Sequence, residues 1–417
     1  MARIAFIGAG STVFTRNLAG DLLGRPELAG STFALMDVDP DRLATSHRAV
    51  EQLVAAHGAD ATVEATLDRR AALARADYVV TSFQVGGLES TLVDFEVPKR
   101  FGLRQTIGDT LGVGGISRAL RTIPVLLDVC RDMEELCPDA LLLQYVNPMA
   151  MLCWAVAEAS PVRTVGLCHS VQHTTAELAA DLGVPADEVD AHVAGINHLA
   201  FFLRLERGGE DLYPALHEVE PPPGNLVRYE VLRHLGAFVT ESSEHFAEYV
   251  PWFIKADRPE LVERFGIPLD EYVRRLRAQA GDWEKPLEVG RSHEYGADIV
   301  RACETGEPFR FNGNVMNAGW IENLPPDCCV EVPCVADARG ITPEPVGALP
   351  RHLAALIQTN VNVQGLAVEA ALTGSRDAAR RAAMLDPHTA AELPLDEIAA
   401  LMDALIDAHG ERIPPLR

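Results

Sequence analysis

The chain has no apolar run approaching the roughly 20 residues that a membrane-spanning helix needs, so the sequence predicts no transmembrane segment. The first apolar stretch meets a glycine-rich turn after seven residues, which is too short for the apolar region of a signal peptide. Paired CxxC spacing is also missing, and the eight cysteines are scattered. This pattern disfavours a disulfide framework and is typical of free thiols in a reducing compartment. We therefore expect a cytoplasmic protein.

Basic residues are few, with 36 Lys and Arg against 60 Asp and Glu, and the formal net charge is −24. So acidic a chain repels the phosphates of nucleic acids and of anionic membrane surfaces. We expect neither as a partner. The 417 residues suffice for two or three domain-sized units, and the composition is that of an ordinary globular enzyme.

Strands and helices alternate over the first 170 residues or so. Apolar runs at 3–8, 31–36, 77–83, 140–145 and 164–167, with a short one near Val63, predict strands separated by helices. Such alternation favours a parallel sheet with helices on both faces. The later chain is less regular and ends in helices expected at 349–372, 375–385 and 395–408. We predict an α/β protein with a Rossmann-like domain at 1–190 and an α+β catalytic domain at 191–417.

A glycine-rich turn, GAGST at 8–12, lies between the first strand and its helix. Gly8 and Gly10 permit a tight turn and close approach of a pyrophosphate, and Ser11 and Thr12 open the helix whose N-terminus favours an anion. The third glycine of the usual fingerprint is missing. Asp37, at the end of the next strand, is placed to accept from ribose hydroxyls, which favours NAD over NADP. A plain strand–helix turn capped by an aspartate is the alternative.

Two further strand ends carry polar groups, with Asn147 after one strand and Cys168 after the next. Ligands of open α/β sheets gather at the carboxyl ends of the strands. A thiolate from Cys168 and an imidazole from His198 suit a borderline-soft divalent metal and leave coordination positions open for substrate. Taken singly, Cys168 also fits a buried core thiol, Asn147 a turn before proline, and His198 a hydrogen-bonded polar residue.

Long strings of this sequence, in order from end to end, resemble family 4 of the glycoside hydrolases, which depend on NAD and a divalent metal. Within the family the likeness is greatest to α-galactosidases of the melibiase type. The strings are GAGST (8–12), FQVGG (83–87), IGDTLGVGGISRALRTIP (107–124), YVNPMA (145–150), GLCHS (166–170), AGINH (194–198), TESSEHFAEYVPWF (240–253), NLPPDCCVEVPC (323–334) and DPHTAAEL (386–393).

The resemblance implies glycoside cleavage through oxidation and elimination, an exception to hydrolysis by two carboxylates. NAD⁺ takes a hydride from C3 of the sugar, and the metal polarises the oxygens on C2 and C3. A base then removes the acidified C2 proton, and the glycosidic oxygen leaves. Water adds at C1, and NADH returns the hydride, so the cycle is redox-neutral.

The resemblance also implies roles for individual residues. Cys168 and His198 match metal ligands, and Asn147 matches a sugar-binding asparagine. Tyr249 matches the base, and Arg291 matches a substrate contact. His169 takes the place of an aspartate that is the proposed acid in 6-phospho-glycosidases, and Asp109 is expected to orient that acid or to contact the sugar. Packing in an aromatic cluster is the alternative for Tyr249, a turn cap for Asp109, and a surface position for Arg291.

The segment after the fourth strand reads VGGLES, with Glu89 where 6-phospho members use a basic residue to bind phosphate. This favours an unphosphorylated sugar. We therefore expect hydrolysis of α-galactosides, with Mn²⁺, or else Co²⁺, Ni²⁺ or Fe²⁺, as the metal. The family habit implies a homodimer or homotetramer. Three hypotheses compete with this one. The first is an α-glucosidase or α-glucuronidase with the same chemistry, the second is an NAD-dependent 2-hydroxy-acid dehydrogenase, and the third is an inactive nucleotide sensor.

Overall fold

The computed structural model of the chain describes residues 1–278, 292 and 294–417. Its first half contains a parallel sheet whose strands follow the order β3-β2-β1-β4-β5-β6. This is the usual order of the Rossmann fold, and it confirms the fold class predicted for the first half. The strands are β1 (Arg3–Ile7), β2 (Thr32–Met36), β3 (Thr62–Thr66), β4 (Tyr78–Thr81), β5 (Leu141–Gln144) and β6 (Arg163–Gly166).

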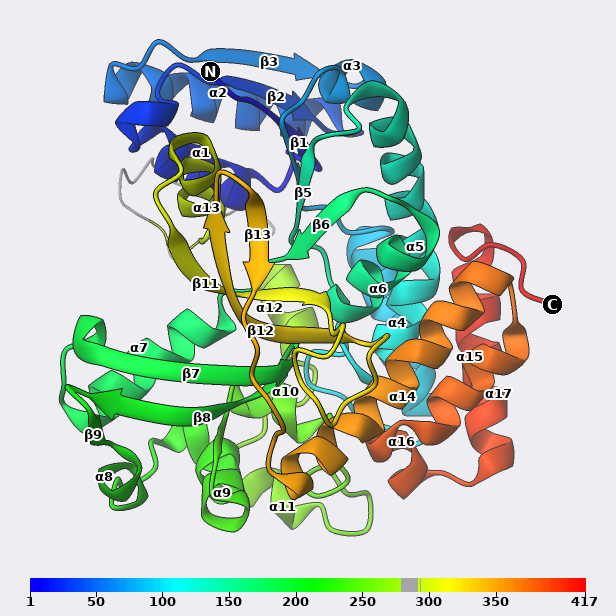
Figure 1. Ribbon diagram of the computed structural model, residues 1–417. Helices are drawn as coiled ribbons and strands as arrows, with labels where there is room; N and C mark the ends of the chain where they lie inside the picture. Colours follow the sequence, from blue (N-terminus) through cyan, green and yellow to red (C-terminus); the bar gives the residue numbers. More distant parts are fainter. Residues whose placement is uncertain (279–291, 293) are drawn as a thin grey trace.

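Helices cover both faces of this sheet (Figure 1). Helix α1 packs with α2 and α13, whereas α5 packs with α3, α4 and α6. Local chemistry sets their ends: Asp39 caps α2 through the amides of Asp41 and Arg42, and Gly58 ends it with φ of +60°. The helices of this half are α1 (Thr12–Leu23), η1 (Pro26–Leu28), α2 (Pro40–His57), α3 (Arg69–Leu73), α4 (Gly87–Arg100), α5 (Gly112–Leu136), α6 (Met149–Ala159) and α7 (Ser170–Leu182).

Antiparallel strands extend the same sheet beyond β6, in the order β11-β12-β7-β8-β10. The junctions are narrow, since β6 meets β11 through Gly166 and Asn314, and β12 meets β7 through Glu331 and Gly195. The boundary predicted between residues 190 and 191 falls inside β7. The strands are β7 (Val189–Ile196), β8 (Leu199–Arg207), β9 (Glu210–Asp211), β10 (Phe238–Val239), β11 (Phe309–Met316), β12 (Cys329–Asp337) and β13 (Gly340–Pro343).

Short helices surround the antiparallel strands, and the C-terminal helices pack on α4, α5 and α6 (Figure 1). The helical C-terminus predicted from the sequence is confirmed, with α16 added between two of the expected helices. The helices are η2 (Ala186–Glu188), α8 (Tyr213–His217), η3 (Pro223–Asn225), α9 (Leu226–Leu235), α10 (Ser243–Ala247), α11 (Glu260–Arg264), α12 (Glu271–Ala278), α13 (Gly296–Thr305), α14 (Arg351–Thr373), α15 (Arg376–Leu385), α16 (Pro387–Glu392), α17 (Leu395–His409) and η5 (Gly410–Arg412).

Among the described residues, none of the helices combines the length and the apolar character that crossing a membrane requires. All eight cysteines are free thiols, and Cys168 and Cys303 are the ones that are not fully buried. The carboxyl ends of β1, β2, β5 and β6 lie along one edge of the parallel sheet, and the candidate site residues follow them there.

Candidate active site

The turn between β1 and α1 requires both of its glycines. Gly8 has φ of +94°, and a Cβ there would lie 2.8 Å from Cβ of Phe83. The amide of Gly10 donates to Oδ2 of Asp37 at 2.7 Å, and a Cβ on Gly10 would lie 2.6 Å from that oxygen. The backbone of the turn therefore packs directly against the ends of β4 and β2.

The other residues predicted for nucleotide binding differ in where their side chains lie. Ser11 lines the cavity beside the turn, and so does Asp37, whose second oxygen accepts from the amide of Asp39 at 2.9 Å. The side chain of Thr12 is buried instead. Its hydroxyl donates a hydrogen bond to the carbonyl oxygen of Gly10 at 3.3 Å and accepts one from Oγ of Ser46 at 3.0 Å. Thr12 thus stabilises the turn and does not face the cavity.

A cavity of 790 Å³ extends from this turn to the predicted metal ligands. Its size lies in the range of about 300–1,000 Å³ that is typical of ligand sites. We call it the main cleft. Residues of the nucleotide end include Gly8, Gly10, Ser11, Asp37, Val38, Asp39 and Arg42, and those of the other end include Asp109, Arg118, Asn147, Cys168, His169, His198, Glu241, His245, Tyr272, Arg275 and Glu294.

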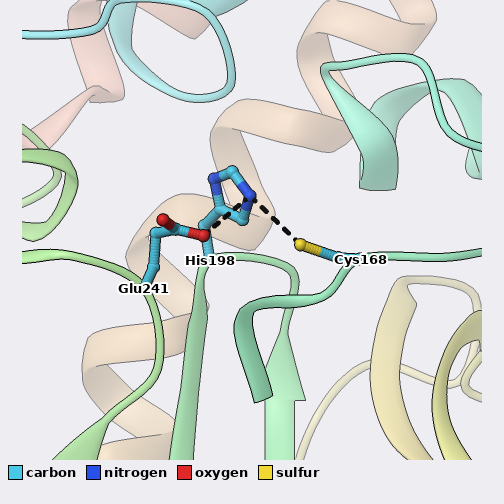
Figure 2. Close-up of side chains that lie close together, drawn as sticks. All are labelled: Cys168, His198 and Glu241. Atoms are coloured by element: carbon cyan, nitrogen blue, oxygen red, sulfur yellow. Dashed lines mark hydrogen bonds and ion pairs between the residues drawn. The ribbon is translucent and has the colours of Figure 1, made fainter. Parts of the chain in front are cut away.

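Cys168 and His198 lie together at the end of the main cleft, and Glu241 joins them (Figure 2). Sγ of Cys168 is 3.5 Å from Nε2 of His198, and Oε2 of Glu241 is 3.1 Å from the same nitrogen. The three ligand atoms all lie within 4.8 Å of one another. Sequence reasoning missed Glu241. A single divalent ion between a thiolate, an imidazole and a carboxylate fits this donor set, with positions left for substrate oxygens.

The three side chains influence one another electrostatically. Burial lowers the pKa of His198, but the charges of Glu241 and Cys168 outweigh it and raise that pKa to about 10. Burial raises the pKa of Glu241, yet His198 and His245 bring it down to about 2. These values describe a protonated His198 beside an ionised Glu241, so a divalent cation that binds here takes the place of the proton on the imidazole.

Three tyrosines lie near this end of the cleft, and they differ in exposure and partners. Tyr145 lines the cleft, and its hydroxyl accepts from the amide of Gly296 at 3.1 Å. Tyr249, the predicted base, is fully buried and lies outside the lining of the main cleft. Its hydroxyl is 3.2 Å from Nδ1 of His198, the nitrogen that faces away from the cluster. Tyr272, which sequence reasoning missed, lines the cleft, and its hydroxyl accepts from Arg118 at 3.4 Å.

Asp109 and Asn147, predicted from different parts of the sequence, are neighbours. Nδ2 of Asn147 donates to Oδ2 of Asp109 at 3.4 Å, and Arg118 lies 3.6 Å from the same oxygen. Burial raises the pKa of Asp109, but Arg118 and His245 outweigh this effect and hold it below its ordinary value. The pair thus presents a carboxylate and an amide to the cleft, which are groups that bind sugar hydroxyls.

His169 lies at the mouth of the cleft, next to Cys168, with its side chain 62% exposed. Its Nδ1 is 3.6 Å from Oε1 of Glu294, whose pKa burial and Asp21 raise to about 7. An imidazole in this place can transfer a proton to a bound group. Arg291, the predicted substrate contact, lies outside the described residues.

The structure does not support the argument that Glu89 repels a phosphorylated sugar. Glu89 lies on the exposed side of α4, is outside the lining of the main cleft and pairs with Arg412 near the C-terminus. A helix that begins at Gly87 turns this side chain away from the site. Selectivity against phosphate therefore cannot be attributed to Glu89.

A sheet in this order, with a glycine turn at one end of a cleft and a metal-ligating cluster at the other, is typical of nucleotide-dependent enzymes. The chain belongs to family 4 of the glycosyl hydrolases. The model of the family 4 glycosyl hydrolases matches residues 3–184, and the model of their C-terminal domain matches residues 193–389. The family predicted from the sequence is thereby confirmed, and the chain is a glycoside hydrolase.

Individual relatives cover nearly the whole chain. An α-galactosidase of Bacillus subtilis (strain 168) is 49% identical over 99% of both chains. An α-galactosidase of Rhizobium meliloti (strain 1021) is 37% identical over 99% of this chain and 89% of its own. The structure of a 6-phospho-β-glucosidase from Thermotoga maritima with manganese, NAD⁺ and glucose-6-phosphate has the same fold, with a TM-score of 0.82, 23% identity and 99% of both chains covered.

Proposed function

We propose that this enzyme hydrolyses α-galactosides with NAD and a divalent metal, Mn²⁺ by preference, as cofactors. One observation carries the mechanism: a thiolate, imidazole and carboxylate cluster lies at the end of a cleft that begins at a dinucleotide-type turn. The 49% identity to an α-galactosidase over the full chain supports the choice of sugar. The α-glucosidase and α-glucuronidase alternatives share the chemistry, and neither they nor a 2-hydroxy-acid dehydrogenase is favoured.

The residues present fit both cofactors. The turn at Gly8 and Gly10 and the carboxylate of Asp37 suit NAD, and Cys168, His198 and Glu241 suit the metal. When bound, NAD exchanges a hydride with sugar C3 and the metal acts as a Lewis acid for the oxygens on C2 and C3.

Protein side chains supply the remaining functions. Asn147 and Asp109 bind and orient the hydroxyls of the sugar, and His169 protonates the leaving oxygen at the cleft mouth. For removal of the C2 proton we favour Tyr272 over Tyr249, because Tyr272 faces the cleft and lies beside a fixed cation. Burial lowers the pKa of Arg118, but Tyr272 and Asp109 raise it above its ordinary value, so the cation beside Tyr272 persists.

Hydrolysis of p-nitrophenyl α-galactoside tests the proposal. The assay contains Mn²⁺ and a thiol reductant in D₂O, with and without NAD⁺. Cleavage that requires NAD⁺, accumulates no NADH and places deuterium at C2 of galactose is the expected result. Cleavage without NAD⁺ contradicts the mechanism, and net NADH production points to a dehydrogenase. No cleavage contradicts the sugar assignment, and α-glucosides and α-glucuronides are then assayed.

We also infer a cytoplasmic location and a homodimer or homotetramer. Eight free cysteines support the location. Light scattering measures the assembly, and a monomeric mass contradicts the second inference.

A further inference from the structure

A second cavity of 560 Å³ adjoins the main cleft at its metal end. We call it the side cavity. His169, Glu241, His245 and Arg275 line both cavities, so the two meet at the candidate metal cluster. The side cavity therefore continues the cleft on the side away from the nucleotide turn.

The walls of the side cavity are polar and firmly held. Arg228 on α9 is buried, and its guanidinium donates to Asn225 at 2.5 Å, to Thr174 at 3.0 Å and to Glu177 at 2.5 Å. Glu244, which also lines the side cavity, pairs with Arg275 at 2.6 Å. Buried charged groups with satisfied partners form a preorganised surface for hydrogen bonds.

Four carboxylates, two guanidinium groups and three histidines line the side cavity, whereas aromatic and aliphatic side chains are scarce. With neutral histidines the lining has a formal charge of −2. This balance disfavours an anion, and the shortage of apolar surface disfavours an aromatic or lipid-like ligand. An uncharged polyol suits it, because hydroxyls both donate to carboxylates and accept from guanidinium groups. The ionisable lining residues are His169, His173, Glu177, Asp181, Arg228, Glu241, Glu244, His245 and Arg275.

We propose that the side cavity binds the leaving group of the substrate, an uncharged sugar linked to the reacting galactose. This assignment rests on the proposed function. His169, the residue placed to protonate the leaving oxygen, lies on the boundary between the two cavities. A galactose held by Asn147 and the cluster in the main cleft therefore directs its C1 substituent past His169 into the side cavity.

His173→Ala tests the assignment, with His234→Ala as a matched control. Each histidine faces a glutamate one helical turn away, His173 with Glu177 at 3.3 Å and His234 with Glu230 at 3.5 Å. Their side chains are 66% and 69% exposed. Of the two, His173 alone lines the side cavity. The measured quantity is kcat/KM for melibiose divided by kcat/KM for p-nitrophenyl α-galactoside. We expect a fall of about threefold to tenfold, the worth of one hydrogen bond, for His173→Ala and an unchanged ratio for His234→Ala.

A second pair of variants addresses a buried part of the wall. Glu244 and Glu230 each pair with an arginine, and their side chains are 14% and 17% exposed. Glu244→Gln should lower the same ratio, and Glu230→Gln, which lies outside both cavities, should not.

If the ratio is unchanged in both His173→Ala and Glu244→Gln, whether or not the two activities fall together, the side-cavity assignment is overturned while the proposed function stands. Failure of the unaltered enzyme to cleave either galactoside overturns the proposed function as well.

Discussion

His198 and Glu241 both have left-handed backbone conformations, with φ of +66° and +67°. Such conformations cost on the order of 1–3 kcal/mol for residues other than glycine and concentrate at functional sites. Here they direct an imidazole and a carboxylate at one point beside Cys168 (Figure 2). The backbone itself therefore sets the direction of two of the three candidate ligands.

Replacement of single ligands should separate metal binding from nucleotide binding. Cys168→Ser should abolish metal-dependent hydrolysis. Glu241→Gln should weaken Mn²⁺ binding by at least the roughly 10- to 100-fold that loss of a mere supporting partner costs, because it removes the charged ligand itself. Titration calorimetry measures Mn²⁺ and NAD⁺ separately. NAD⁺ affinity should persist in both variants, because Asp37 and the glycine turn lie at the other end of the cleft. Unaltered Mn²⁺ affinity in Glu241→Gln would remove Glu241 from the ligand set.

Tyr272 and Tyr249 should respond differently to removal of their hydroxyls. Tyr272→Phe should reduce hydrolysis at least about 100-fold, the usual worth of a general base, and leave Mn²⁺ affinity unchanged. Tyr249→Phe should instead weaken Mn²⁺ binding, because its hydroxyl contacts Nδ1 of His198. Deuterium exchange at C2 of galactose, with NAD⁺ and Mn²⁺ present, measures the proton step. If exchange stops in Tyr249→Phe and continues in Tyr272→Phe, the base predicted from the sequence is right and our assignment is wrong.

Sequence reasoning located those site residues that follow regular strands. Asn147 and Cys168 come just after β5 and β6, and both line the main cleft. Glu241 follows β10, a strand of two residues that leaves no apolar pattern to read. The burial of Tyr249 depends on packing between distant segments, as its backbone contact with Asn360 at 3.3 Å illustrates. No local signal in the sequence reports such packing.

At the level of elements, the two predicted domains share one sheet because β11 and β12 reach across to β6 and β7. Parallel strands joined by helices leave a strong local pattern, and the sequence predicted them. Antiparallel pairing between strands more than 100 residues apart, such as Asn314 with Gly166, has no such pattern. The sequence therefore predicted the first half of the fold in detail and the second half only by class.

The C-terminal helix α17 is joined to the first half through a buried charge group. Asp94 on α4 pairs with Arg121 at 2.5 Å and with His409 at 2.8 Å, and all three side chains are at most 3% exposed. Asp94→Asn leaves a buried guanidinium unpaired and should lower the free energy of unfolding by about 3–5 kcal/mol. Urea denaturation measures the change.

Asp403→Asn is the control for this prediction. Asp403, like Asp94, has two ion-pair partners, which here are Arg376 and Arg380. The three side chains of this group are 25–33% exposed. Exposed pairs contribute only about 0–1 kcal/mol. Equal losses in the two aspartate variants would show that burial does not set the strength of the Asp94 group.

At the level of the whole molecule, an acidic chain keeps several carboxyl groups away from water. Burial raises the pKa of both Glu248 and Glu331 to about 7. In Glu248 it does so although three backbone amides donate to the carboxylate and favour its charged form. Glu331 is the less well supported of the two: neither of its oxygens has a partner at normal hydrogen-bond geometry, and His198 and Asn197 only partly offset its burial. It lies in β12 at the narrow junction with β7, next to Gly195.

This burial predicts a pH dependence of stability that a single substitution removes. The carboxyl of Glu331 has a pKa of about 7 when folded, against an ordinary 4.5. Between pH 4.5 and 7 the folded state binds more protons than the unfolded state. The contribution of the Glu331 carboxyl to the free energy of unfolding is therefore fully present below pH 4.5 and is lost as the pH rises to 7. Glu331→Gln keeps the shape but has no charge to bury. The variant should therefore gain stability relative to the unaltered enzyme over this window, by on the order of 3 kcal/mol at pH 8. Urea denaturation at pH 4.5, 6 and 8 measures the difference, with exposed Glu322→Gln as the control. A difference that stays constant with pH would mean that Glu331 is already ionised in the fold, and a partner for its charge must then lie within the sheet junction.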